Sequence, residues 1–332
     1  MSYSEFQLIR RFFVDQGLGF ERQGVVLGIG DDAAIVQPPA GMALALSLDT
    51  LVAGIHFSED AAPEQIANRA LAVNLSDLAA MAAEPLCFTL GLTLPTSDDR
   101  WLQRFSAGLL PLAREFNCSL VGGDTTRGPL AITVQVHGFG AADSLLRRST
   151  AQPGDCLCVT GTLGDAAAAL LALDTQSHLG KGFRFEHEPT PAERDYFVAR
   201  YFAPTPRVNF SRSNAAMINA CIDISDGLIG DLGHLLEASG AGAELDVALL
   251  PYSAAVKRTL SREHAEQAAL AGGDDYELCF TVPVSQLASV QAQGAALGVN
   301  VTQIGQVSDK PGLRLTRDGR RIDSAGESYQ HF

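Results

Sequence analysis

Lysine is scarce in this chain of 332 residues, which contains only Lys181, Lys257 and Lys310. With the arginines these make 24 bases against 38 acids, a formal net charge of −14. A protein this acidic has no basic surface for DNA or RNA, and an anionic membrane surface would repel it. We therefore expect neither a nucleic acid nor a membrane as a partner. Any anionic ligand must be held by something other than lysine.

Long apolar runs and paired cysteines are also absent. The chain has no apolar stretch of about 18 residues, the length that a membrane-spanning helix requires. Residues 1–11 include charged side chains in place of the apolar segment of a signal peptide. The six cysteines form no C-x-x-C pair and lie mostly in apolar, strand-like segments such as 156–158. We therefore expect free, buried thiols and a cytoplasmic location.

Several signatures of nucleotide-binding and hydrolytic proteins are missing. No G-x-x-x-x-G-K-[ST] loop occurs, and Lys181 lies in a polar connection and not after a strand. The protein-kinase motifs H-R-D and D-F-G and the G-x-S-x-G motif of many hydrolases are also absent. A P-loop fold, a protein-kinase fold and the commonest hydrolase mechanism are therefore excluded.

The length and the order of segments predict two mixed α/β domains, with α+β character. A turn-rich stretch, Ser149–Asp155, sets the expected boundary, so the domains would be residues 1–149 and 150–332. Helices are expected at residues 4–14, 63–83, 98–117, 226–239 and 284–297, and after Gly164. Strands are expected at residues 42–48, 86–94, 131–139, 156–160, 220–224, 243–247, 277–282 and 301–307, with a short strand leading into 121–124.

Aspartate recurs beside glycine or serine at the ends of strand-like segments, where α/β proteins commonly build ligand sites. Five segments show this pattern: Gly30–Asp32, Ser47–Thr50, Gly122–Asp124, Asp223–Gly227 and Gly272–Glu277. A sixth acid, Asp77, lies in an apolar helical run, residues 71–81, where an unpaired carboxylate would be costly. Asp77 is therefore expected to be paired or to bind a cation.

Each of these segments also has a structural interpretation, because a Gly–Asp pair is usually a turn or a helix cap. We assign that role to Asp32, Asp165, Asp231 and Asp275. Six coincidences of carboxylate, small residue and strand end or buried helix still favour a site. Hard oxygen donors without clustered histidine or cysteine suit Mg²⁺, which in proteins usually accompanies phosphate chemistry. Several metal ions bridged by aspartates, assisted by arginine and backbone N–H groups, would then neutralise a nucleotide.

Taken together, the motifs resemble the thiamine-monophosphate kinase family, in the ATP-binding superfamily that includes aminoimidazole ribonucleotide synthetase. The resemblance spans essentially the whole chain. It rests on Gly28–Ala34, Ser47–Val52 with Gly54–Phe57, Asn74–Met81, Gly122–Thr125, Asp223–Leu228 and Gly272–Leu278. It implies ATP-dependent phosphorylation of thiamine monophosphate to the diphosphate. It also implies a homodimer whose N-terminal domains pair their sheets, with a C-terminal domain that completes the active-site cleft.

The resemblance also implies roles for individual residues. The Mg²⁺ ligands would be Asp31, Ser47, Asp49, Asp77, Asp124, Asp223 and Asp226, with Leu48 contributing only its backbone carbonyl. ATP would contact Gly123, Asp124, Arg148 and Ser225, and the substrate would contact His56, Asp274 and Tyr329. Two positions depart from the family pattern. Leu48 stands where a hydroxyl residue is common, and Asp274 stands where glutamate is common, which shortens its reach by one methylene.

The implied reaction needs no catalytic general base. The acceptor is a phosphate whose second pKa is about 6, so its attacking oxygen is mostly deprotonated at neutral pH. The barrier lies in bringing two anions together, which metal-bound aspartates can relieve, and we expect direct in-line transfer without a phosphoenzyme. Two alternatives remain: another synthetase of the same superfamily, or a non-catalytic protein that binds nucleotide or metal.

Overall fold

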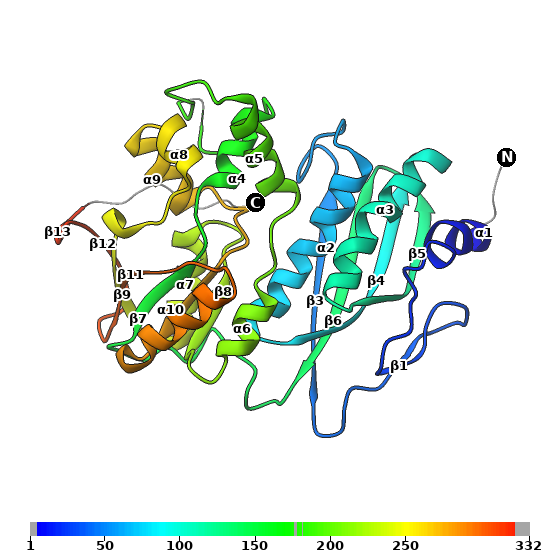
Figure 1. Ribbon diagram of the computed structural model, residues 1–332, viewed down its shortest axis with the longest axis horizontal. Helices are drawn as coiled ribbons and strands as arrows, with labels where there is room; N and C mark the ends of the chain where they lie inside the picture. Colours follow the sequence, from blue (N-terminus) through cyan, green and yellow to red (C-terminus); the bar gives the residue numbers. More distant parts are fainter. Residues whose placement is uncertain (1–4, 176–177, 181, 323–332) are drawn as a thin grey trace. The chain divides into compact units, whose positions relative to one another are not determined.

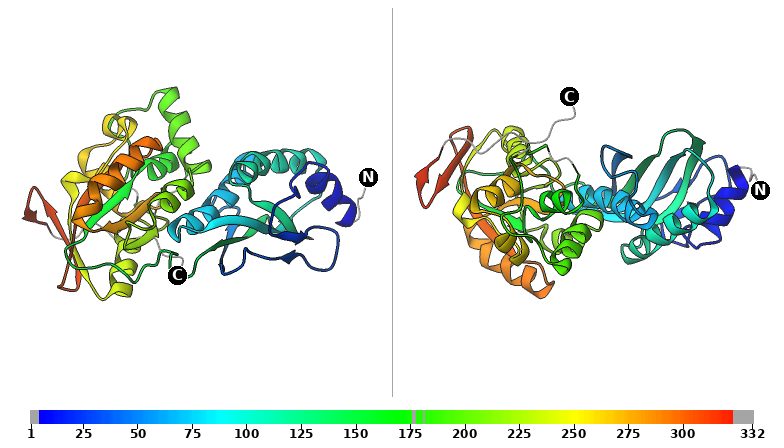
Figure 2. Two further views of the ribbon diagram at one scale, coloured as in Figure 1. Left: turned by 60° about the horizontal axis from the view of Figure 1, so that its bottom comes forward. Right: turned by 90° about the horizontal axis from the view of Figure 1, so that it is seen from above.

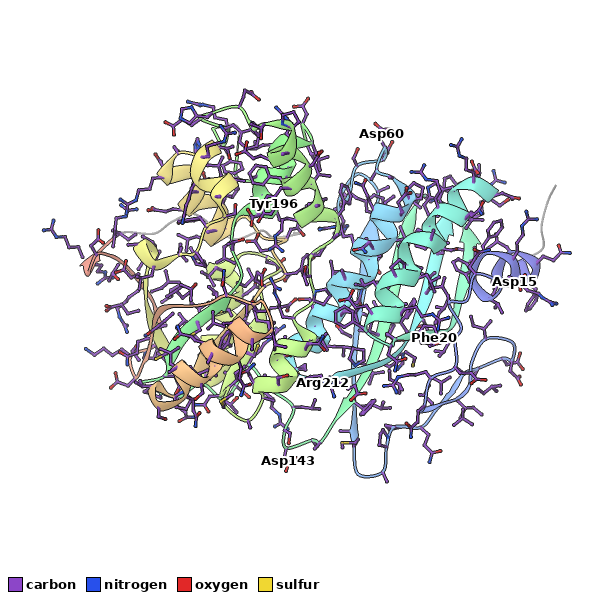
Figure 3. The ribbon with its side chains drawn as sticks, in the orientation of Figure 1. Asp15, Phe20, Asp60, Asp143, Tyr196 and Arg212 are labelled. Atoms are coloured by element: carbon purple, nitrogen blue, oxygen red, sulfur yellow. The ribbon has the colours of Figure 1, made fainter. Side chains whose placement is uncertain are left out.

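The computed structural model describes residues 5–175, 178–180 and 182–322, which fall into two compact units (Figure 1). Unit 1 comprises Met1–Leu78 and Ala83–Asp143, and unit 2 comprises Ala79–Ala82 and Ser144–Phe332. Asp143, labelled in Figure 3, is therefore the last residue of unit 1.

Unit 1 is built around a four-stranded sheet in the order β3-β6-β4-β5, in which only β4 and β5 run parallel. A separate pair, β1 and β2, forms a small antiparallel ribbon. The elements are α1 (Glu5–Ile9), the π-helix η1 (Arg10–Val14), β1 (Val25–Leu27), β2 (Ile35–Val36), β3 (Ala43–Val52), α2 (Pro63–Ala80), β4 (Glu84–Leu94), α3 (Asp99–Glu115), β5 (Ser119–Arg127) and β6 (Ala131–Gly140).

Helices α2 and α3 cover one face of this sheet (Figures 1 and 2). Alternate residues of the strands, such as Leu90 and Val134, are buried beneath them. Helix α3 begins where the Asp98 carboxylate accepts hydrogen bonds from the backbone N–H groups of Arg100 and Trp101, which would otherwise be unsatisfied. The opposite face of edge strand β3 exposes Leu44, Leu46 and Leu48, and the last two are each 54% exposed.

Unit 2 contains a seven-stranded sheet in the order β13-β12-β9-β11-β7-β10-β8, in which only β9 and β12 run parallel. The elements are β7 (Cys156–Thr160), α4 (Asp165–Ala172), α5 (Pro191–Phe202), α6 (Val208–Asn214), β8 (Ala220–Asp223), α7 (Leu228–Ser239), β9 (Gly242–Asp246), the 3₁₀ turn η2 (Val247–Leu249), α8 (Ala254–Thr259), α9 (Arg262–Ala271), β10 (Leu278–Val282), the 3₁₀ turn η3 (Val284–Gln286), α10 (Leu287–Ala296), β11 (Val301–Ser308), β12 (Gly312–Arg317) and β13 (Arg320–Arg321).

Both faces of the central strands of unit 2 are covered by helices. Leucines of α7 pack with Leu157, Val159 and Ile222 in one apolar core. On the other face, Phe210 of α6 packs against Phe280 of β10 with ring centroids 5.5 Å apart, and α10 contacts α6. The central strands are therefore apolar on both faces, which explains why they read as continuous hydrophobic segments.

All six cysteines are buried and free, as predicted. Burial raises the pKa of the Cys87 thiol to about 12, so this group stays neutral and unreactive near pH 7. Within the described residues, no helix has the length and apolar character needed to span a bilayer.

The expected elements are present in the structure, with differences at their ends. Strand β3 continues through Asp49 to Val52 because each of its residues pairs with β6. Helix α7 begins at Leu228 and not at Asp226. Gly227 has φ +114°, which is not a helical conformation, so the helix cannot include it or the residues before it. Four helices and four short strands were not anticipated: α5, α6, α8, α9, β1, β2, β12 and β13.

Candidate active site

In unit 1, strand β3 and helix α2 bring three of the predicted ligands together. The Ser47 hydroxyl donates a hydrogen bond of 2.6 Å to Asp77 Oδ2, and Asn74 Oδ1 accepts one of 3.1 Å from the Asp49 backbone N–H. Asn74 and Asp77 are three residues apart, so they share one face of the helix. The residues just before Asp77 are buried while its own side chain is half-buried, and the predicted pairing of this carboxylate is confirmed.

Leu48 points away from this group. Because side chains alternate along a strand, it lies on the open face of the sheet, opposite to Ser47 and Asp49. Its side chain therefore cannot reach Asp77.

Gly123 and Asp124 lie on β5, next to β4. A Cβ atom on Gly123, which has φ +153°, would lie 1.9 Å from the Leu90 carbonyl oxygen, so only glycine fits here. In the strand register Asp124 is in the row of Gly91, Thr133 and Thr50, whereas Asp49 is in the row of Val134 and Leu90. The sheet therefore separates Asp124 from Asp49 and Asp77 within one chain.

Two further candidates of unit 1 lie in connections. Asp31 is exposed, and its carboxylate accepts a hydrogen bond of 2.8 Å from the Asp32 backbone N–H. His56 is half-buried just after β3, where its Nδ1 accepts a bond of 3.0 Å from the Val52 backbone N–H. This contact puts the proton of the neutral ring on Nε2.

In unit 2 the end of β8 forms a compact acidic turn. Asp223 is buried at the strand end, and Ser225 and Asp226 follow it in the loop before α7. Their backbone N–H groups both donate to Asp231 Oδ2, over 2.9 Å and 3.1 Å. Burial, followed by the nearby Asp226 charge, raises the pKa of the Asp231 carboxyl to about 7. Asp231 thus has the structural role predicted for it.

Asp274 contacts the same turn through the backbone. Its N–H donates to the Ser225 carbonyl over 2.7 Å, and the Tyr276 N–H donates to the Ile224 carbonyl over 2.9 Å. The Tyr276 hydroxyl lies 3.4 Å from Asp274 Oδ1. Two motifs about fifty residues apart in the chain, 223–227 and 272–277, therefore meet in space.

Arg148 is exposed, and its backbone carbonyl accepts a bond of 2.7 Å from the Ser239 hydroxyl. Its charge lies near the Cys221 thiol on β8. Tyr329, the third predicted substrate contact, lies outside the described residues.

The donor atoms of these residues suit Mg²⁺ in kind, because carboxylate and hydroxyl oxygens are the ligands that this ion prefers. Among the residues that the structure describes, however, no three or more His, Cys, Asp and Glu side chains gather closely enough to hold a metal ion. The Ser47 hydroxyl and the Asp77 carboxylate are joined by a hydrogen bond, and by themselves they do not form a metal site.

Two residues that the sequence did not mark as site residues hold candidate site residues in place. Asn74 supports Asp49, and Glu277 is bound by Arg200 and Arg207 beneath the segment that carries Asp274. Their partners are distant in the sequence, so no local pattern marks these pairs.

Comparison with known proteins identifies the family of this chain. Two family models match the sequence. The family "AIR synthase related protein, N-terminal domain" matches residues 30–142, and the family "AIR synthase related protein, C-terminal domain" matches residues 152–318. Thiamine-monophosphate kinase of Escherichia coli (strain K12) is 45% identical over 333 residues, covering 100% of this chain and 99% of the relative. The chain belongs to the thiamine-monophosphate kinase family.

Solved structures agree with the thiamine-monophosphate kinase assignment. The crystal structure of thiamine-monophosphate kinase from Stenotrophomonas maltophilia K279a has a TM-score of 0.85 and 41% identity, covering 97% of this chain and 99% of that one. AaThiL complexed with AMPPCP and TMP has a TM-score of 0.74 and 28% identity, covering 98% and 96%. The predicted mixed α/β fold is therefore confirmed over almost the full length.

Proposed function

We propose that this protein transfers the γ-phosphoryl group of ATP directly to thiamine monophosphate, giving thiamine diphosphate and ADP. The full-length identity of 45% to the Escherichia coli thiamine-monophosphate kinase carries the proposal. The similar structure that holds AMPPCP and TMP supports both substrates. Retention of the acidic motifs argues against a non-catalytic binding protein.

Mg²⁺ would be held by Asp31, Ser47, Asp49, Asp77, Asp124, Asp223 and Asp226, and by the backbone carbonyl of Leu48. When bound, Mg²⁺ supplies the positive charge that screens two phosphate groups from one another. The contacts seen in the structure prepare two of these ligands. Ser47 fixes the orientation of the Asp77 carboxylate, and Asn74 fixes the backbone beside Asp49.

Other residues would bind and orient the two substrates. Gly123, Asp124, Arg148 and Ser225 would contact ATP, with Arg148 exposed enough to reach a phosphate. His56 and Asp274 would contact thiamine monophosphate, with Tyr329 as a further contact. The His56 Nε2–H is a hydrogen-bond donor, because Nδ1 already accepts from the Val52 backbone.

No side chain is required as a general base, because the acceptor phosphate is mostly deprotonated at neutral pH. The residues need only hold the acceptor oxygen in line with the γ-phosphorus and exclude water. Stereochemical analysis with a chiral phosphoryl group would show inversion at phosphorus. Net retention would instead indicate a phosphoenzyme.

We also propose that the protein is a cytoplasmic homodimer that pairs through the sheets of unit 1. Edge strand β3 exposes Leu44, Leu46 and Leu48 on one face. An exposed edge strand with an apolar face is a surface that proteins normally cover. Six buried thiols suit a reducing compartment.

The decisive experiment incubates the purified protein with ATP, Mg²⁺ and thiamine monophosphate, and follows thiamine diphosphate by chromatography. A matched reaction contains free thiamine, which lacks the acceptor phosphate and should not react. We expect product only with thiamine monophosphate, and none in the presence of a chelator. Absence of product under all conditions, with nucleotide binding intact, would instead support a binding protein.

A further inference from the structure

In the segment 272–277, the side chains of residues 274–277 alternate between partly exposed and buried. Asp275 and Glu277 are 2% and 1% exposed, whereas Asp274 and Tyr276 are half-buried. Asp274 has φ +61° and Tyr276 has φ +48°, in the left-handed region that is unfavourable for a non-glycine residue. Two strained residues so close together need an external anchor.

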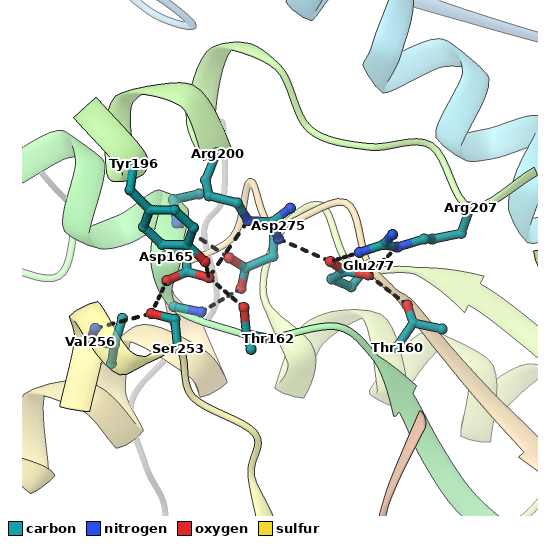
Figure 4. Close-up of polar contacts among 12 residues, drawn as sticks. Thr160, Thr162, Asp165, Tyr196, Arg200, Arg207, Ser253, Val256, Asp275 and Glu277 are labelled. Atoms are coloured by element: carbon teal, nitrogen blue, oxygen red, sulfur yellow. Dashed lines mark hydrogen bonds and ion pairs between the residues drawn. The ribbon is translucent and has the colours of Figure 1, made fainter. Parts of the chain in front are cut away.

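Glu277 is the better-bound of the two buried residues (Figure 4). Arg207 donates to it through both Nε and a terminal nitrogen, over 2.7 Å and 2.6 Å, and Arg200 donates over 3.0 Å. The Thr160 hydroxyl adds a bond of 2.7 Å. A buried carboxylate that accepts from two guanidinium groups resists displacement, because any movement leaves a charge unpaired.

The ion pairs around Glu277 continue through Arg200 to Asp165, the first residue of helix α4. Figure 4 shows Arg200 between Glu277 and Asp165, whose Oδ2 lies 3.6 Å from Arg200 Nε. Asp165 accepts from the Tyr196 hydroxyl over 2.9 Å and from the Ser253 hydroxyl over 2.6 Å. Tyr196, also labelled in Figure 3, belongs to α5, and Ser253 is the residue before α8. Through Asp165, which begins α4, both are linked to Arg200.

The turn after β7 is shaped to receive the same segment. The Asp275 carboxyl group accepts a hydrogen bond of 2.8 Å from the Gly164 backbone N–H, at the N-terminus of α4. A Cβ atom on Gly161, with φ +60°, would lie 2.1 Å from Glu277 Oε1. Only glycine permits this approach, so the turn and the Glu277 carboxylate fit one another.

We propose that Glu277, held by Arg200 and Arg207, is a positioning residue for thiamine monophosphate: it holds Asp274 and Tyr276 in the strained conformation that presents them to the substrate. This inference rests on the proposed function of Asp274. Glu277 acts through the backbone, since its own carbonyl accepts a bond of 2.8 Å from the Ile224 N–H and so locks the segment to the acidic turn.

The test compares Glu277→Gln, which keeps the shape and removes the charge, with a matched control. Glu266→Gln is that control, because Glu266 is also a buried carboxylate bound by two arginines, Arg262 and Arg317, at a different place in unit 2. Arg207→Lys is a milder second variant, in case Glu277→Gln does not fold, since lysine cannot form the two-point contact. All are assayed for the KM of each substrate and for backbone hydrogen exchange.

We expect Glu277→Gln to raise the KM for thiamine monophosphate about tenfold and the KM for ATP less than twofold. Arg207→Lys should give a smaller change of the same kind. Backbone amides of Asp274 and Tyr276 should exchange faster in both variants. Glu266→Gln should lower the unfolding temperature without changing either KM. Equal changes in both KM values, or the same rise in the Glu266→Gln control, would overturn the inference.

The exchange measurement separates this inference from the proposed function. If the wild-type protein makes no thiamine diphosphate, the proposed function fails. Faster exchange in the segment of Glu277→Gln would then still support the anchoring step, and unchanged exchange would overturn it.

Discussion

The Asp77 carboxylate is the proposed Mg²⁺ ligand whose orientation the structure shows most directly. It lies within helix α2 and accepts a hydrogen bond of 2.6 Å from the Ser47 hydroxyl, so its orientation is set before any ligand binds. We expect Asp77→Asn to lower kcat by about 100-fold or more, since the amide keeps the size but loses the charge that a metal needs. A thiamine diphosphate assay at saturating Mg²⁺ measures this.

Asp32 provides the control. It is an exposed aspartate in another of the acidic motifs, and we assigned it a structural role. Asp32→Asn should keep wild-type activity within about twofold, as surface substitutions usually do. Similar losses in the two variants would show that the effect reflects net charge and not the Asp77 position.

The buried carboxyl of Asp275 gives stability a pH dependence. Burial raises its pKa to about 8, and the nearby Asp165 adds to the effect. In the unfolded chain its pKa is about 3.9. Between these values the unfolded chain loses the proton that the folded protein retains, so this contribution to stability is complete below about pH 4 and lost as the pH rises to 8.

Asp275→Asn should therefore unfold with a shallower decline in midpoint temperature between pH 5 and pH 8 than the wild type. Thermal unfolding across that range measures the difference in slope, with each kcal/mol corresponding to roughly 2–4 °C. Parallel curves for the two proteins would contradict the assignment. An overall offset between them carries no weight, because the amide replaces one acceptor with a donor.

At the scale of elements, strand β5 depends on the close approach of its backbone to β4. Gly123→Ala would place a Cβ atom 1.9 Å from the Leu90 carbonyl oxygen and must push the strands apart. We expect a loss of stability of several kcal/mol and loss of activity, because Asp124 moves with the strand. Chemical denaturation and the kinase assay measure both effects.

Gly122 serves as the control for Gly123→Ala, because it lies in the same strand but has room for a Cβ atom. A Cβ atom on Gly122 would meet nothing nearer than Thr89 Cγ2 at 3.9 Å, an ordinary contact. Gly122→Ala should therefore stay close to wild type in stability and activity. A defect as large as that of Gly123→Ala would show that any substitution in this strand is disruptive.

At the scale of the whole molecule, the apolar face of β3 predicts association. Leu46→Glu combined with Leu48→Glu puts two charges on that face and should convert a dimer to a monomer, because a buried unpaired charge is costly. Sedimentation velocity measures the mass. Leu249→Glu, at a similarly exposed leucine of unit 2, should leave the mass unchanged. A wild-type monomer would refute the proposed dimer.

The sequence alone was enough to recognise the acidic motifs and to predict the α/β character of the fold. It also predicted the order along the chain of most strands and helices. These follow from local patterns: apolar periodicity, glycine and proline positions, and aspartate at strand ends. The buried thiols and the pairing of Asp77 were predictable for the same reason, since a charge or thiol in an apolar run has few alternatives. Helices such as α5 and α9 were missed because their apolar faces are short and pack against other helices, α5 against α4, and α9 against α4, α7 and α8.

Only the tertiary structure decided which of these residues meet. The register of β3, β6, β4 and β5 puts Asp124 and Asp49 on opposite faces of one sheet, and a one-residue shift would reverse this. The contact between the turn at Ser225 and Asp274, and the arginines around Glu277, join segments far apart in the chain. Such contacts depend on packing and not on local preference, so the sequence could name the acidic residues but could not show what holds them in place.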